Sequence, residues 1–186
     1  MWLIDLVENL LSVTRIEEGR MQIRQSAELV DEVIREALKH TGQSRTGRTI
    51  KVEEEDELIL AKMDARLIVQ VLINLIGNAV KYTPQGTDIT VRVRKEKAEN
   101  GENSQVIISV CDLGDGIPDD RKERVFDMFY TGGDQVADSR RSLGLGLGLC
   151  RSIINAHGGK IWISDNIPHG AVVTFTLPAE EVALNE

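Results

Sequence analysis

Residues 64–82 read DARLIVQVLINLIGNAVKY, and this stretch decides how the rest of the chain is interpreted. Apolar side chains recur at helical spacing, which predicts an amphipathic helix with one broad buried face. That face comprises Ile68, Val71, Leu72, Leu75, Ile76, Ala79 and Val80. At about 100° per residue the remaining polar positions form a second stripe. The members of this stripe are Gln70, Asn74, Gly77, Asn78 and Lys81.

The polar stripe contains no acidic residue, unlike most solvent-exposed helix faces. Amide oxygens can ligate a hard cation, and a lysine can bind a phosphate group. Ordinary exposed polar residues would give the same pattern. The stripe alone therefore leaves both interpretations open.

Composition limits the classes of function. The chain has 186 residues, of which 41% are hydrophobic and 28% charged, as expected for one soluble globular domain. The net charge of −8 argues against non-specific nucleic-acid binding, because that needs a basic surface. Cys111 and Cys150 have no metal-site spacing, so neither a zinc site nor a disulfide framework is expected, and a reducing cytosol fits best.

The remaining periodicities predict an α+β fold, a two-layer sandwich with helices on one face of a mostly antiparallel sheet. Ser26 and Asp64 are predicted to cap helices, and Gly19 to end one. The predicted helices span 1–19, 26–40, 64–82 and 149–157. The predicted strands span 20–25, 48–54, 57–62, 87–95, 105–112, 159–164 and 171–178. The first helix has the apolar spacing of a coiled-coil seam, which predicts a bundle partner.

A tight loop is predicted at 110–118, VCDLGDGIP, directly after an apolar strand. Its glycines would allow the backbone to approach a flat ligand closely. The carboxylate of Asp112 would emerge beside the sheet and need a donor, such as the exocyclic amine of a base. A plain turn ended by Pro118 is the alternative interpretation.

A glycine-rich stretch at 142–150, SLGLGLGLC, precedes the last predicted helix. Glycines at a helix N-terminus favour phosphate binding, because backbone N–H groups there have no partner within the helix. Gly144 and Gly146 would let the backbone close on the ligand, while Leu145 and Leu147 anchor it to the core.

Two neighbouring segments accompany this stretch. The sequence ERVFDMFY at 123–130 predicts a short amphipathic turn packed as an aromatic anchor. The segment TGGDQVADSRRS at 131–142 is small and polar, with Arg140 and Arg141 near its end. This composition suits a mobile lid whose cations reach phosphates, or a plain surface loop.

Together, NLIGNAVKYTP, DLGDGIP, VFDMFY and GLGLGLCRSIINAHGG resemble, in this order, the N, G1, F and G2 boxes of sensor histidine kinases. These kinases share an ATP-binding fold with gyrase, mismatch-repair and chaperone ATPases. The resemblance covers essentially the whole chain, and residues 125–159 are similar to Kdp-type kinases, which respond to potassium or osmotic stress.

The resemblance implies a two-layer α/β sandwich of the Bergerat (histidine kinase-like ATPase) type. Residues 1–19 would be the C-terminal part of a second dimerisation helix, 20–180 the ATP-binding catalytic domain and 181–186 a tail. It also implies ATP and Mg²⁺ as cofactors, held between the N-box helix and the lid.

The implied site is assigned residue by residue. Asn78 would ligate Mg²⁺, with Asn74 ordering the metal–phosphate region, and Lys81 would contact phosphate. Asn74 and Lys81 are the residues assigned to catalysis, and Asp112 would accept a hydrogen bond from the adenine amine. The other residues implied to line the nucleotide are Tyr82, Gly114, Gly116, Ile117, Phe129, Arg140, Gly144, Leu145, Gly146, Leu147 and Thr174.

The sequence departs from the family pattern at three positions. Ser142 replaces the usual first glycine of the G2 box, and Gly148 stands where Ala or Ser is commoner. Val172 stands where a Thr often lies near adenine in the family, and Thr174 is the threonine expected to substitute for it.

The histidines give a further departure, because His40, His157 and His169 all lack the sequence context of a phosphoacceptor. The resemblance therefore implies a fragment of a protein-histidine kinase. It would transfer the γ-phosphoryl group of MgATP to a histidine on a separate helix, for relay to a response-regulator aspartate.

The implied partners are the kinase's own dimerisation and phosphoacceptor domain, in a homodimer, and a response regulator. Nucleic acid is not expected, and a membrane only through the rest of a membrane-anchored bacterial sensor, of which this would be a cytoplasmic domain. A nucleotide-sensing module without transfer is the alternative, as is an ATPase or serine kinase of the same fold. A Rossmann site is disfavoured, because no glycine fingerprint opens a βαβ unit.

Overall fold

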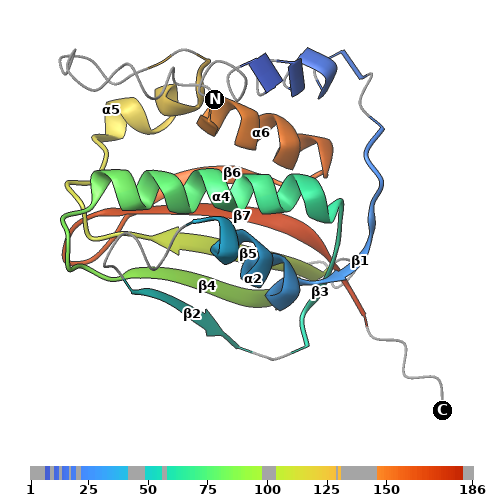
Figure 1. The fold of residues 1–186 in the computed structure, drawn as a ribbon, viewed down its shortest axis with the longest axis horizontal. Coiled ribbons are helices and arrows are strands. Elements are labelled where there is room, and N and C mark those ends of the chain that lie inside the picture. The colour runs from blue at the N-terminus through green and yellow to red at the C-terminus, as the bar shows by residue number, and fades with distance from the viewer. Residues whose placement is uncertain are drawn as a thin grey trace.

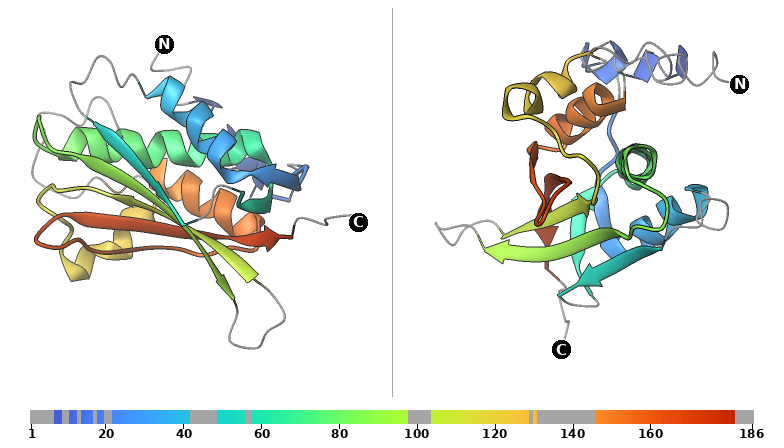
Figure 2. Two further views of the ribbon diagram at one scale, coloured as in Figure 1. Left: turned by 90° about the horizontal axis from the view of Figure 1, so that it is seen from below. Right: turned by 90° about the vertical axis from the view of Figure 1, so that its left-hand side faces the viewer.

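The computed structural model describes residues 7–8, 11–12, 14–16, 18–19, 22–41, 49–55, 58–97, 104–128, 130 and 146–181. Within these ranges the chain forms one seven-stranded sheet with helices packed on one face (Figures 1 and 2). The strands are β1 (Ser26–Leu29), β2 (Ile50–Glu54), β3 (Leu60–Met63), β4 (Ile89–Lys97), β5 (Ser104–Cys111), β6 (Ile161–Asp165) and β7 (Ala171–Glu180). The helices are α2 (Val30–His40), α4 (Ala65–Tyr82), α5 (Asp119–Lys122), the 3-10 helix η1 (Arg124–Phe126) and α6 (Gly146–Ala156).

The sheet is mixed but mostly antiparallel, in the order β1-β3-β7-β5-β4-β2, with β6 also paired to β7. Only β2 and β4 run parallel among the described strands. This confirms the predicted α+β sandwich. No helix among the described residues is long and apolar enough to cross a bilayer.

The core lies between the sheet and α4. Because side chains alternate along a strand, each central strand sends every second residue toward the helices. These inward residues include Val91 on β4, Ile108 on β5 and Phe175 on β7, all fully buried. From α4 the predicted apolar face meets them, with Ile68 and Leu72 among its fully buried members.

Helix α6 lies antiparallel to α4 in the same layer (Figure 1). Three contacts fix this arrangement: Asp64 meets His157 at one end, Val71 meets Cys150 in the middle, and Asn74 meets Gly146 at the other end. The Sγ of Cys150 lies 3.8 Å from the carbonyl oxygen of Val71. The start of α6 is therefore held beside the polar stripe of α4.

The sequence prediction for residues 20–40 was wrong in two respects. Residues 22–25 carry no regular structure, and β1 begins at Ser26, where a helix cap was predicted. The Oγ of Ser26 donates to Glu28 at 2.6 Å, and α2 begins at Val30. Pairing of β1 with β3 satisfies the backbone here, so tertiary pairing outweighs the local cap signal.

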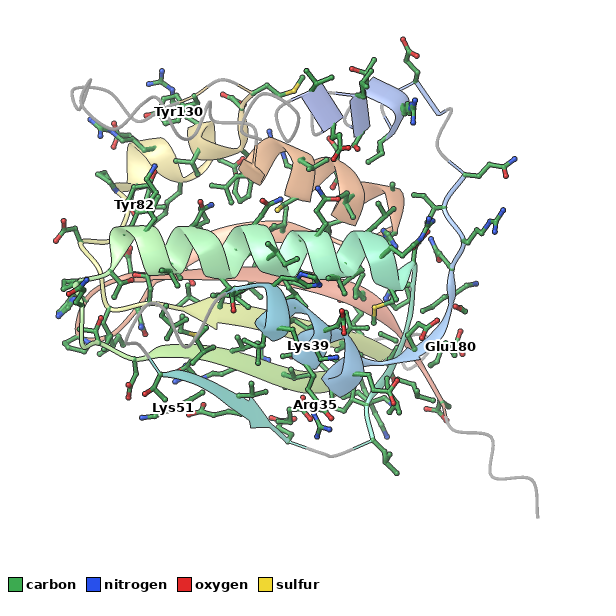
Figure 3. The ribbon with its side chains drawn as sticks, viewed as in Figure 1. Arg35, Lys39, Lys51, Tyr82, Tyr130 and Glu180 are labelled. Carbon is green, nitrogen blue, oxygen red and sulfur yellow. The ribbon has the colours of Figure 1, made fainter. Side chains whose placement is uncertain are left out.

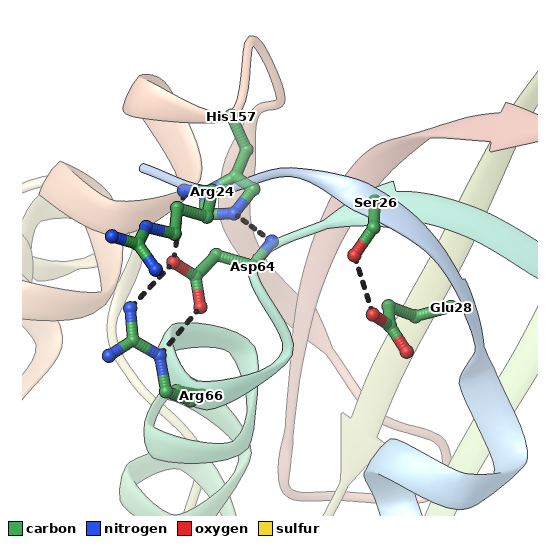
Figure 4. A network of polar contacts seen from close by, with 6 residues as sticks. All are labelled: Arg24, Ser26, Glu28, Asp64, Arg66 and His157. Carbon is green, nitrogen blue, oxygen red and sulfur yellow. Dashed lines mark hydrogen bonds and ion pairs between the residues drawn. The ribbon is translucent and has the colours of Figure 1, made fainter. Parts of the chain in front are cut away.

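Asp64 was predicted to cap α4, and it does occupy the N-cap position, but its carboxylate has other partners (Figure 4). Oδ2 accepts from the backbone N–H of Arg24 at 3.2 Å and from the Arg66 guanidinium at 3.1 Å. Burial alone would raise the pKa of the Asp64 carboxyl, but the hydrogen bonds from Arg66 and Arg24 outweigh it and lower the pKa. Asp64 thus ties the segment before β1 to the start of α4.

His157 closes the same network from the end of α6 (Figure 4). Its Nδ1 donates to the Ile153 carbonyl at 2.7 Å, and its Nε2 accepts from the backbone N–H of Asp64 at 3.0 Å. Burial lowers the pKa of His157, which keeps the ring neutral. Gly158 follows with φ +75, as predicted for a glycine that ends a helix.

The N-terminal stretch has helical backbone at residues 7–8, 11–12 and 14–16. The N–H of Gly19 donates to the Ile16 carbonyl at 3.1 Å, in agreement with a predicted helix end at Gly19. Val7 and Leu11 are about half exposed, at 47% and 48%, whereas Ile16 packs against the core.

Candidate functional site

Asn74, in the polar stripe of α4, faces the first turn of α6. A Cβ added to Gly146 would lie 3.8 Å from both Cγ and Oδ1 of Asn74. The Nδ2 of Asn74 is buried and has no hydrogen-bond partner among the described residues. The group beside it is the thiol of Cys150, a weak acceptor at best. A buried amide without a proper partner is costly, and it suggests that this position serves a ligand.

Asn78 lies one turn further along α4 on the same face, half-buried. Lys81 follows near the end of the helix, where its Nζ lies 5.1 Å from the ring centroid of Tyr82. Figure 3 shows Tyr82 at this end of α4, where 62% of the residue is exposed. Two amides and a lysine therefore run in line from the middle of α4 to its exposed end.

Helix α6 begins at Gly146, inside the glycine-rich stretch and three residues before the predicted start at residue 149. Its first turn carries no acidic side chain, and Leu147 packs against the core. Burial raises the pKa of the Cys150 thiol to about 12, so this cysteine is a neutral packing group between α6 and α4. The first turn of α6 thus lies beside Asn74, and backbone N–H groups at the start of a helix favour a negatively charged group.

Asp112 follows the end of β5, half-buried, with its carboxylate held by two backbone donors. Oδ1 accepts from the N–H of Gly114 at 2.9 Å and from the N–H of Ala171 at 3.2 Å. Among the described residues, both hydrogen bonds to this carboxylate are accepted by Oδ1. Oδ2 is therefore the oxygen left to accept from a ligand donor.

The loop after Asp112 packs directly on the end of α4. A Cβ on Gly114 would lie 2.5 Å from the carbonyl oxygen of Tyr82, so only glycine fits there. Gly116 has φ +76, which also favours glycine. The sequence suggested these glycines for close approach to a ligand, and the structure adds a packing reason. The loop brings Asp112 to the same end of α4 as Lys81 and Tyr82.

Ile117 joins a small satellite cluster with Phe126, Ile163 and Ala171. Phe126 is buried, and the Arg151 guanidinium lies 5.2 Å from its ring centroid. The predicted aromatic anchor is therefore present at η1. It supports the loop after Asp112 from the side of α5 and β6.

Thr174 is not brought to this group of residues. Its Oγ1 lies 2.9 Å from the Oγ of Ser109, and its neighbours Val173 and Phe175 are the ones that face the helices. Strand alternation therefore puts Thr174 on the opposite face of the sheet. Ala171 is the β7 residue that contacts the Asp112 carboxylate.

Several predicted site residues lie outside the described part of the chain, namely Phe129, Arg140, Gly144 and Leu145. Ser142, which departs from the family pattern, also lies outside it. Sequence reasoning also missed Asn166 and His169, which contact the backbone of Asp112 and Gly114. The available signal was turn chemistry, because Asn, Pro and Gly cluster at 166–170.

No cluster of three or more His, Cys, Asp or Glu residues that could hold a metal occurs in the described ranges.

Comparison with known proteins places these features in a family. Residues 63–181 match the model described as histidine kinase-, DNA gyrase B-, and HSP90-like ATPase. The chain belongs to this ATPase family. The match includes α4, the Asp112 loop and α6, so the candidate site lies within an ATP-binding domain of this family.

The curated relatives include a sensor protein and a sensory kinase. Sensor protein KdpD of Clostridium acetobutylicum is 41% identical over 179 residues, covering 96% of this chain and 19% of KdpD. The adaptive-response sensory kinase SasA of Gloeothece citriformis is 33% identical over 175 residues, covering 93% of this chain and 43% of SasA. The chain thus spans less than half the length of these two relatives.

Solved structures give the same fold. The catalytic domain of histidine kinase ThkA has a TM-score of 0.68 at 31% identity, covering 83% of this chain and 95% of that one. ThkA in complex with response regulator protein TrrA has a TM-score of 0.71 at 28% identity, covering 96% of this chain and 49% of that one. The fold of this chain is therefore that of a histidine kinase catalytic domain.

Proposed function

We propose that this chain is the ATP-binding catalytic part of a two-component sensor histidine kinase. It would transfer the γ-phosphoryl group of MgATP to a histidine on a dimerisation helix, for relay to a response-regulator aspartate. The observation that carries the proposal is the buried Asn74 amide beside the first turn of α6. It occurs in a chain related to sensor kinases along 96% of its length.

The donor set of α4 fits MgATP. Mg²⁺ prefers oxygen ligands and would be held by the amide oxygen of Asn78, with Asn74 ordering the phosphates beside it. When bound, the metal neutralises negative charge on the phosphate oxygens. Lys81 and the first-turn N–H groups of α6 would hold the remaining phosphate charge.

The base would bind at the Asp112 loop, where Oδ2 accepts from the adenine amine. Further residues proposed to line the nucleotide are Tyr82, Gly114, Gly116, Ile117, Phe129, Arg140, Gly144, Leu145, Gly146 and Leu147. The chain's own contribution to catalysis would be positioning and charge stabilisation, because phosphoryl transfer needs little covalent chemistry from the protein.

The N-terminal stretch would be the C-terminal part of the second dimerisation helix. Its exposed Val7 and Leu11 suit packing against another helix. The parent kinase would then act as a homodimer, with a response regulator as its second partner. Relatedness to KdpD and SasA, and the ThkA–TrrA complex, support this assignment.

The test mixes this chain with a separately made dimerisation domain that carries a phosphoacceptor histidine, in the presence of labelled ATP and Mg²⁺. We expect acid-labile, base-stable label on the acceptor. Asn78→Ala should abolish transfer, whereas Asn155→Ala should not, because Asn155 is an exposed residue near the far end of α6. ATP binding without transfer under Mg²⁺ or Mn²⁺ would contradict the kinase assignment and favour a nucleotide-sensing module.

A further inference from the structure

We propose that Asn166 and His169, on the loop between β6 and β7, are positioning residues for Asp112 and thereby set selectivity for the nucleotide base. Both lie outside the four boxes that resemble the kinase family. The inference rests on the proposed role of Asp112 as acceptor for the adenine amine. Under this proposal, the loop between β6 and β7 contributes to base recognition together with the Asp112 loop.

Asn166 holds Asp112 through the backbone. Its Nδ2 donates to the carbonyl oxygen of Asp112 at 2.7 Å. Its Oδ1 accepts from the N–H of Ile167 at 2.9 Å, and its own N–H donates to the Gly170 carbonyl at 3.0 Å. The side chain is therefore fixed at both ends, and it fixes the peptide group that follows Asp112.

His169 holds another peptide group of the same loop, the one that follows Gly114. Its Nδ1 lies 3.0 Å from the carbonyl oxygen of Gly114. A carbonyl only accepts, so Nδ1 carries the hydrogen in this contact. The N–H of Gly114 in turn donates to Oδ1 of Asp112 at 2.9 Å. His169 thus stabilises the residue that orients the carboxylate.

The start of β7 completes the enclosure. The N–H of Asp112 donates to the Ala171 carbonyl at 2.9 Å, and the N–H of Ala171 returns a bond to Oδ1 at 3.2 Å. Gly170 lies so close that a Cβ there would come within 2.1 Å of the Asp112 carbonyl oxygen. Asn166, Gly170 and Ala171 therefore all lie against Asp112.

These contacts have a consequence for recognition. Because Oδ1 accepts from two backbone N–H groups, the orientation of the carboxylate is fixed before the ligand binds. Oδ2 can then accept from an exocyclic amine without reorganisation. Loss of Asn166 or His169 leaves the carboxylate in place but frees it to turn. We therefore expect the contribution of the amine to binding to fall while phosphate binding persists.

The experiment measures the affinity of the chain for ATP and for ITP by calorimetry with Mg²⁺. Hypoxanthine replaces the amine by a carbonyl oxygen, which Oδ2 repels. The wild-type chain should prefer ATP. Asn166→Leu and His169→Ala should each weaken ATP binding about fivefold, as expected for one lost hydrogen bond, with ITP binding unchanged.

Two kinds of control accompany these variants. His169→Asn keeps a donor near the position of Nδ1 and should restore the preference for ATP. Asn155→Leu and His40→Ala change exposed residues at helix ends remote from Asp112, and should keep the wild-type ratio. Thermal unfolding checks that each variant is folded; because His169 is exposed, its substitution should leave the core intact.

The outcomes separate the two proposals. A wild-type chain that binds ATP and ITP equally would overturn the proposed role of Asp112. A wild-type chain that discriminates, with folded variants that keep the same ratio, would overturn only the role of Asn166 and His169. Equal losses for ATP and ITP would also overturn it, because they indicate a general structural effect.

Discussion

At the scale of single residues, His157 has the most constrained environment. Its Nδ1 donates to Ile153 and its Nε2 accepts from the N–H of Asp64. If Nε2 were protonated, its N–H would point at the N–H of Asp64, and two hydrogen-bond donors would face each other in the protein interior. The neutral imidazole is therefore part of the folded state, as the lowered pKa of His157 also indicates.

This environment predicts how stability depends on pH. Because burial lowers the pKa of folded His157, the unfolded chain takes up the proton first as pH falls below about 6.5. The contribution of neutral His157 to the free energy of unfolding is therefore fully present above that pH and declines below it. Urea unfolding between pH 8 and pH 5 should show this decline, and His157→Gln should flatten it. A variant with the wild-type slope would contradict this account.

The Asp64 carboxyl acts in a separate, more acidic range. Its pKa is lowered in the folded state, so its contribution is present above about pH 4 and is lost as pH falls further. The two decreases in stability therefore occur in different pH ranges and can be measured separately.

Substitution of glycine by alanine should have opposite effects on stability at Gly159 and at Gly77. A Cβ on Gly159 would lie 1.9 Å from the carbonyl oxygen of Thr176, whereas a Cβ on Gly77 meets nothing within 4 Å. Gly159→Ala should lower the free energy of unfolding by about 1–3 kcal/mol or more. Gly77→Ala should raise it by up to about 1 kcal/mol, since alanine favours the helix. Equal effects in urea unfolding would contradict the packing described for Gly159.

At the scale of elements, the sequence was a good guide wherever a helix buries one face. The periodicity of α4 predicted its bounds and its polar stripe, and the glycines after His157 predicted the end of α6. Prediction failed at residues 20–29, just before the correctly predicted helix α2, because β1 exists only through its pairing with β3. That pairing depends on a strand more than thirty residues away in sequence, which no local pattern contains.

The packing of these elements predicts the behaviour of both cysteines. Cys150 is fully buried between α6 and α4, and Cys111 is 4% exposed at the end of β5. Burial raises the pKa of both thiols, that of Cys150 to about 12. Ellman's reagent at pH 8 should therefore label neither thiol until the chain is unfolded. Rapid labelling of Cys150 in native conditions would contradict the α4–α6 interface.

At the scale of the whole molecule, the candidate site is assembled from segments far apart in sequence. Asn74, Gly146 and Asp112 were all identified from their local motifs, and the structure brings the first two into contact. The contacts of Asn166 and His169 with the Asp112 loop were not predictable, because they arise where β5 and β7 pair. Thr174 illustrates the limit of motif alignment, since strand alternation turns it to the opposite face.

We propose that α4, the Asp112 loop and α6 together bind MgATP. The most direct measurement is a calorimetric titration of the chain with Mg²⁺ and a non-hydrolysable ATP analogue, for the wild type, Asn78→Ala and Asp112→Ala. We expect one site per chain and a loss of at least about tenfold in affinity for each variant, as a lost charge-assisted contact would give. No binding by the folded wild type, or unchanged affinity in both variants, would contradict it.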